Sequence, residues 1–247
     1  MPTGIDPVTQ HHVDEMVERL VGEFGDRFER ARIEELMADS LRQLAGPAQV
    51  PDFLPILAYR FTRERLGAIG RVPGGSWDVV FVSLSGGGRG QMAAALATLL
   101  SEGKVTAHAA GTSRHGVLDP TVEAVIRELG VDTSELYVRP VSSDVLAGSD
   151  VIVTLGHSVG EVELPEGAKH EDWRVGNPVG ASLEEVRRVR DDIERRVSAT
   201  TSSGACATFS PSCAHSRPRR RPRRASIPTS RTAKADQPRA QAREAGR

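Results

Sequence analysis

Apolar positions in the first seventy residues recur every three or four residues, the spacing that places side chains on one face of an α-helix. Three such stripes run through residues 13–24, 33–44 and 51–69, and glycine and proline residues separate them. Each stripe is long enough for a short helix with one buried face. The pattern therefore predicts an all-α three-helix bundle over residues 1–70.

Beyond residue 76 the pattern changes to short β-branched runs that alternate with helical stretches. Strands are predicted at 79–82, 105–109, 151–155 and 171–175, and helices at 91–101, 120–129, 145–147 and 183–197. Alternation of this kind favours a parallel sheet with helices on its faces. We predict an α/β domain over residues 71–198, with a small doubly wound four-stranded parallel sheet, after a Pro/Gly linker at 72–76.

The last part of the chain, residues 199–247, has a different composition. Basic residues outnumber acidic ones 11 to 2 there, although the whole chain has a formal net charge of −1. Large apolar residues are almost absent, so a disordered basic tail is predicted. The arginine-rich run at 217–224 would bind nucleic acid electrostatically if the tail is genuine. An out-of-frame ending of a GC-rich gene gives the same composition.

The most informative segment is FVSLSGGGRGQMAAA, residues 81–95, which is typical of a strand end, a glycine-rich loop and a helix start. N–H groups at such a helix start point at one place, where the helix dipole adds partial positive charge. Arg89 adds a guanidinium that can bind an oxyanion through two hydrogen bonds. The predicted anion-binding residues are Ser83, Leu84, Ser85, Gly86, Gly87, Gly88 and Arg89.

This segment resembles the phosphate loop of the low-molecular-weight protein tyrosine phosphatases, and especially of the thiol-dependent arsenate reductases built on that fold. Their loop reads Cys, five residues, Arg, then Ser or Thr. Arg89 matches the arginine, whereas Ser83 stands where the nucleophilic cysteine is expected and Gly90 where the hydroxyl residue is expected. The resemblance covers residues from about 77 to 198 and implies the sheet predicted above.

The resemblance extends more loosely to the N-terminal bundle. Similar bundles precede this domain in some actinobacterial proteins, where they are thought to pair subunits. The resemblance therefore implies a homodimer formed through residues 1–70. A packing extension without a partner explains the same helices equally well.

Other positions depart from what the resemblance implies. The family's general acid is the aspartate of an Asp-Pro pair after the last strand, but here the pair is Asn177-Pro178, and an amide cannot protonate a leaving group. His157 stands roughly where a redox cysteine of the reductases is expected. Both cysteines of the chain, Cys206 and Cys213, lie in the tail. The chain has thus lost the nucleophile, the acid and the redox thiols of the family pattern.

The interpretation that we favour is a degenerate homologue that binds phosphate, arsenate or sulfate with little or no turnover. One alternative is an active phosphatase or arsenate reductase-like enzyme in which His157 activates Ser83 and the loop N–H groups stabilise an oxyanion. Another is a dimerisation or scaffold protein with a vestigial site. No metal or cofactor is expected. Because no signal peptide and no membrane-length apolar run are visible, a cytoplasmic location without membrane contact is expected.

Overall fold

The computed structural model describes residues 7–45, 53–71, 76–113, 116–134, 136–156, 162–166 and 168–202. Three predictions fall on other parts of the chain. Most of the predicted linker, His157 and residues 203–247 of the predicted tail lie outside the described residues.

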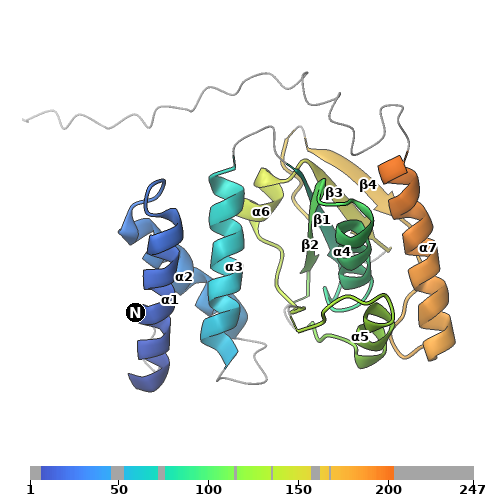
Figure 1. The fold of residues 1–247 in the computed structure, drawn as a ribbon, viewed down its shortest axis with the longest axis horizontal. Helices are drawn as coiled ribbons and strands as arrows, with labels where there is room; N and C mark the ends of the chain where they lie inside the picture. Colours follow the sequence, from blue (N-terminus) through green and yellow to red (C-terminus); the bar gives the residue numbers. More distant parts are fainter. Residues whose placement is uncertain are drawn as a thin grey trace, which may run out of the picture. The chain divides into compact units, whose positions relative to one another are not determined.

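Three helices form the N-terminal region, as predicted (Figure 1). They are α1 (Pro7–Phe24), α2 (Arg30–Ala45) and α3 (Leu54–Ile69). Their apolar stripes meet in one core, in which Leu20, Ile33 and Phe61 are completely buried. Burial of these stripes is the main force that holds such short helices together, because isolated helices of this length are marginal in water.

Four parallel strands form a single sheet in the order β2-β1-β3-β4, which confirms the predicted fold class. The strands are β1 (Trp77–Ser83), β2 (Val105–Gly111), β3 (Val151–Leu155) and β4 (Lys169–Trp173). Strand β4 begins two residues earlier than the sequence pattern indicated. It is an edge strand whose first residues, Lys169 and His170, are exposed, so they lack the apolar alternation that marks a buried strand.

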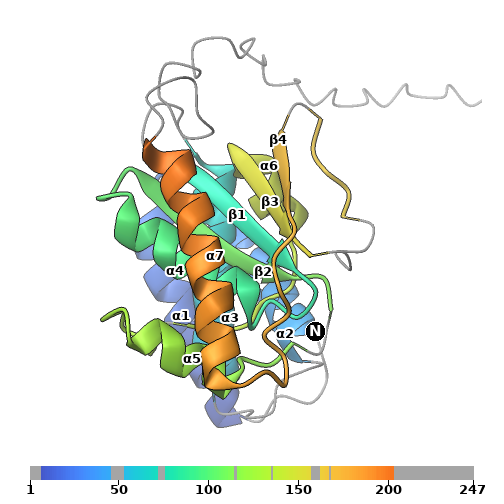
Figure 2. The same ribbon diagram turned by 90° about the vertical axis from the view of Figure 1, so that its right-hand side faces the viewer.

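Helices cover both faces of the sheet (Figure 2). They are α4 (Arg89–Leu100), α5 (Pro120–Arg127), α6 (Ser143–Gly148) and α7 (Leu183–Ser202). Helices α4, α5 and α7 share one core with side chains such as Phe81 and Ile193, whereas α6 packs on the opposite face against Val82 and Ile152. Strands β1 and β3 are neighbours and end at Ser83 and Leu155. The loops that follow these two residues therefore lie at the edge where the connections change from one face of the sheet to the other, the usual position of a binding site in such sheets.

Helix α7 is longer than the sequence pattern indicated. The first four residues of the predicted tail, 199–202, are helical, because adding residues to an existing helix avoids the cost of nucleating a new one. No helix among the described residues is long and apolar enough to cross a membrane.

Buried charges join the helical region to the sheet domain. The Arg65 side chain on α3 is only 7% exposed and bonds Asp39 on α2 at 2.8 Å and Asp144 on α6 at 2.7 Å. A buried guanidinium needs such partners, since an unpaired charge in the interior is strongly unfavourable. The position of α3 against α6 is therefore fixed by ionic contacts as well as by apolar packing.

Candidate functional site

The glycine loop joins the end of β1 at Ser83 to the start of α4 at Arg89, and it is packed too closely for side chains at two positions. Gly86 has φ of +67°, and a Cβ there would lie 2.7 Å from the Gly111 nitrogen. A Cβ on Gly87 would lie 2.0 Å from the carbonyl oxygen of Val117. Glycine is required at both positions because the backbones of neighbouring loops press against this one.

Several N–H groups of this loop remain available. Gly86 N–H donates to Ser83 Oγ at 3.2 Å, and Gly87 N–H donates to Ser85 Oγ at 3.3 Å. The N–H groups of Leu84, Ser85 and Gly88 bond no acceptor in the described part of the chain. The first N–H groups of α4 also lack acceptors within their own helix. The loop thus presents a set of donors at the positive end of a helix dipole.

Arg89 lies beside these donors and is half-buried. Its Nη1 donates to the Val175 carbonyl oxygen at 3.4 Å, and its guanidinium packs so closely on Gly156 that a Cβ there would lie 2.2 Å from Nη1. Burial lowers the pKa of Arg89 from its ordinary value. No carboxylate among the described residues pairs with this guanidinium. Within the part of the chain that the structure describes, this partly desolvated cation has no counter-ion.

Ser83 is buried at the floor of the loop, with 2% of its surface exposed. Its Oγ accepts the Gly86 N–H, and a Cβ placed on Gly90 would lie 3.2 Å from this oxygen. Among the described residues no base accepts a proton from the Ser83 hydroxyl. The proposed partner His157 lies outside those residues. The observed contacts are those of a serine that ends a strand and orders a loop.

The Asn177-Pro178 pair lies next to the loop. The Pro178 ring is 3.2 Å from the place where a Cβ of Gly88 would stand, and the Asn177 side chain is exposed on the same segment. Asn177 Oδ1 accepts the N–H of Val179 at 3.4 Å. The segment after β4 and the loop after β1 thus form one surface, although the assignment of Asn177 to the general-acid position stays a prediction.

Comparison with known proteins decides the family. Residues 78–203 match the family described as low molecular weight phosphotyrosine protein phosphatase, and residues 13–70 match the N-terminal domain of protein-tyrosine-phosphatase-like proteins. The chain belongs to the low molecular weight phosphotyrosine protein phosphatase family. This confirms the resemblance noted in the sequence, whereas the equivalence of Ser83 with a catalytic cysteine stays a prediction.

Several relatives within this phosphatase family are named as arsenate reductases. The chain is 36% identical over 122 residues to a putative arsenate reductase of Halobacterium salinarum, covering 47% of this chain and 85% of that protein. It is 30% identical over 121 residues to arsenate reductase 1 of Staphylococcus epidermidis, covering 48% and 91%. A solved thioredoxin-dependent arsenate reductase of Corynebacterium glutamicum superposes with a TM-score of 0.68 at 26% identity, covering 77% of this chain and 95% of that one.

Three residues of this phosphatase-family site were missed in the sequence. Gln91 bonds the loop from inside α4, Gly156 receives the Arg89 guanidinium, and Val175 supplies a carbonyl oxygen to it. A glycine directly after the predicted strand 151–155 was a usable signal for a close approach. Nothing in the local pattern marks Gln91 or Val175, because their roles depend on contacts far apart in the sequence.

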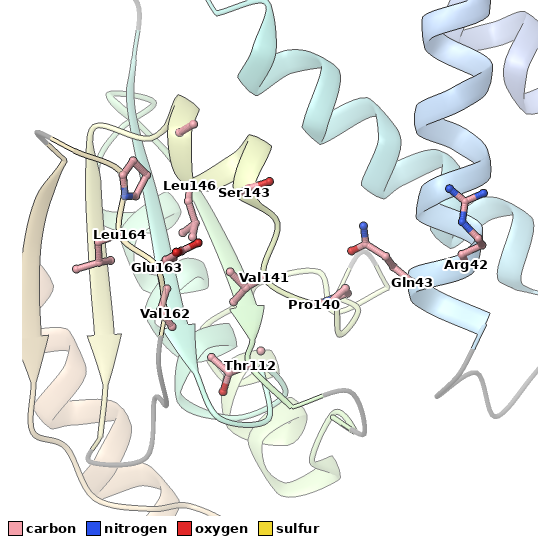
Figure 3. Close-up of a pocket in the computed structure, with 13 residues that line it drawn as sticks. Arg42, Gln43, Thr112, Pro140, Val141, Ser143, Leu146, Val162, Glu163 and Leu164 are labelled. Atoms are coloured by element: carbon pink, nitrogen blue, oxygen red, sulfur yellow. The ribbon is translucent and has the colours of Figure 1, made fainter.

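A cavity of about 940 Å³ has no residue of the loop 83–89 in its lining (Figure 3). Its walls include Leu146 of α6, Thr112 after β2, Glu163 before β4 and Arg42 of α2. Among the described residues no group of three His, Cys, Asp or Glu side chains is placed to hold a metal ion.

Proposed function

We propose that this phosphatase-family protein binds phosphate-like oxyanions, namely phosphate, arsenate or sulfate, at the loop 83–89 with little or no turnover. The observation that carries the proposal is the half-buried Arg89, which has no carboxylate partner among the described residues. A desolvated cation beside unused N–H donors is unfavourable until an anion completes the site. An oxyanion satisfies the guanidinium and the loop N–H groups together.

Low turnover follows from the side chain at the floor of the site. A helix N-terminus and an arginine lower a thiol pKa enough to give a thiolate near neutral pH. The same field does not ionise a hydroxyl, so Ser83 would need an adjacent base, and the described residues provide none. Asn177 cannot act as a proton donor in place of an acid. No cysteine precedes Cys206 in the sequence.

The relatives support arsenate as one of the ligands, because several of them are named as arsenate reductases. Reduction of arsenate in this family uses thiols, and binding of the oxyanion does not. We therefore extend the ligand class of the relatives to this chain, but not their reductase activity. The homodimer through the helical region, nucleic-acid binding by the tail and the cytoplasmic location stay predictions.

The test is a calorimetric titration of the full chain with phosphate, arsenate and sulfate at constant ionic strength. We expect saturable binding that is abolished in Arg89→Ala. The matched control is Arg188→Ala, which removes the same charge from an exposed position of α7 where Arg188 pairs with Glu184. That control should bind like the unaltered protein.

Three results would contradict the proposal in different ways. Equal affinity in Arg89→Ala would place the anion elsewhere. Absence of saturable binding in the unaltered protein would favour a scaffold with a vestigial site. Turnover of an aryl phosphate that disappears in Ser83→Ala would favour the enzyme in which Ser83 acts as nucleophile.

A further inference from the structure

Three consecutive glycines make the oxyanion loop intrinsically flexible, so something else must fix the direction of its N–H groups. Gln91, in the first turn of α4, is 4% exposed and reaches back into the loop. Its Nε2 donates to the Gly86 carbonyl oxygen at 3.1 Å. Gly86 is also the loop residue with φ of +67°, a conformation that glycine adopts readily and other residues rarely do.

The bond from Gln91 determines where the next N–H group points. In a trans peptide the C=O and the following N–H point in opposite directions. A Gly86 carbonyl held toward Gln91 therefore turns the Gly87 N–H away from the Gln91 side chain. This N–H makes a 3.3 Å bond to Ser85 Oγ, which an oxyanion would replace.

Gln91 is itself held by a second segment, residues 136–141, which we call the bracing segment. Gln91 Nε2 also donates to the Tyr137 carbonyl oxygen at 2.8 Å. The same segment bonds the end of β2 twice, because Gly111 N–H donates to the Arg139 carbonyl at 2.9 Å and Val141 N–H donates to the Gly111 carbonyl at 3.0 Å. Gly111 in turn is the residue that packs against Gly86. The bracing segment thus supports the loop through two routes.

The other side of the bracing segment belongs to the helical region. The Tyr137 side chain packs against the core formed by α1, α2 and α3. The Arg139 side chain is 11% exposed, and its Nη2 lies 2.6 Å from the Glu64 carboxylate of α3, which is 9% exposed. A buried ion pair of this kind is costly to break from one side, since the remaining charge is left without a partner.

We propose that Gln91 is a positioning residue for the oxyanion loop and that the bracing segment transmits to it the support of Glu64 on α3. This inference rests on the proposed oxyanion binding at the same loop. The helical region then contributes to oxyanion binding, because Glu64 of α3 supports the bracing segment. Its contribution to affinity runs through Arg139, Tyr137 and Gln91.

The first experiment replaces Gln91 by methionine, which keeps the length of the side chain and removes its donors. We expect the dissociation constant for inorganic phosphate, measured by calorimetry on the full chain, to rise about tenfold, or ~1.4 kcal/mol. The control is Gln43→Met on α2, where Nε2 bonds Asp39 instead, and its affinity should stay within about twofold of the unaltered protein. In the same samples the amide ¹H–¹⁵N resonances of Gly86 and Gly87 should shift only in Gln91→Met.

The second experiment tests the connection to the helical region. Glu64→Gln should raise the phosphate dissociation constant about threefold, and the double variant should bind no more weakly than Gln91→Met alone, because both changes act through one segment. Circular dichroism checks that each variant is folded, and Gln91→Leu, which also removes the donors at similar volume, takes the place of Gln91→Met if that variant does not fold. Independent, multiplicative effects would overturn the bracing segment as the link.

The two proposals fail in distinguishable ways. No phosphate binding by the unaltered protein would overturn oxyanion binding, and the Gly86 and Gly87 resonances would still report on the bracing. Unchanged affinity in a folded Gln91→Met would overturn the positioning role while leaving the oxyanion site in place. Unmoved Gly86 and Gly87 resonances in that variant would overturn it as well.

Discussion

The buried histidine of β2 gives the sharpest quantitative prediction, because its ionisation is coupled to the contact between the helical region and the sheet. His108 Nδ1 contacts the Glu64 carboxylate, and its Nε2 lies 3.4 Å from Asp78 Oδ1. Burial and the charge of Arg139 lower the pKa of His108. Hydrogen bonds to Asp78 and Glu64, together with the charge of Glu64, raise this pKa by more. The balance places the pKa at about 9, compared with 6.5 for an ordinary histidine.

The sign of the effect follows from this raised pKa. The folded protein binds the His108 proton more tightly than the unfolded chain, so the contribution to stability is complete below pH 6.5. It decreases as the pH rises and is lost above about pH 9. A shift of this size corresponds to roughly 3 kcal/mol of the free energy of unfolding, at 1.36 kcal/mol for each pKa unit.

The assay is urea unfolding of the full chain and of His108→Gln at intervals between pH 6 and 9.5. The unaltered protein should lose up to about 3 kcal/mol more than the variant across this range. The control is His11→Gln, whose side chain on α1 is 72% exposed and whose pH profile should follow that of the unaltered protein. Tyr137, whose pKa burial raises to about 12, stays neutral throughout. Parallel profiles for the unaltered protein and His108→Gln would refute the reasoning.

Two further changes test the oxyanion site. Gly156→Ala puts a Cβ 2.2 Å from Arg89 Nη1 at φ of +89°. We therefore expect a loss of about 1–2 kcal/mol of stability and a phosphate affinity, measured by calorimetry, that is at least tenfold weaker. Unchanged affinity would show that the guanidinium needs no contact with Gly156. Combining Ser83→Cys with Asn177→Asp restores a thiol and a proton donor, so we expect p-nitrophenyl phosphate turnover above that of either single variant. An ordinary pKa for the thiol introduced at position 83, together with no turnover, would contradict the assignment of these two positions.

The sequence was most informative where the structure depends on local order. A β-branched run, three glycines, an arginine and a run of helix formers are enough to predict β1, the loop and α4, although the helix begins at Arg89, two residues before the predicted start at 91. Four short strands between helical stretches also predict the parallel sheet. The predicted ends of an element were less accurate where its residues are polar and exposed, as in the edge strand β4.

The sequence was least informative about the support of the site. Gln91 stands among strong helix formers and gives no sign that it bonds Tyr137, 46 positions away. The pairing of Glu64 with Arg139 and His108 likewise joins segments that are distant in the chain. Periodicity reports which face of an element is buried and cannot report which buried polar groups meet there. These contacts become visible only when the helical region and the sheet are packed together.

Strand β2 connects the buried ionic contacts of Glu64 with the loop that precedes Arg89. His108 lies three positions before Gly111 on this strand. Glu64 of α3 contacts His108, and Gly111 at the end of the strand packs against Gly86 of the loop. Loss of Glu64 would leave the buried Arg139 without this carboxylate partner and would lower the pKa of His108, because Glu64 is one of the groups that raise it. Such an arrangement is strongly unfavourable. The boundary predicted near residue 70 therefore separates two sequence regions but cuts through one set of interdependent charges, and the loop after β1 is contacted, through Gly111 and Gln91, by segments that α3 holds.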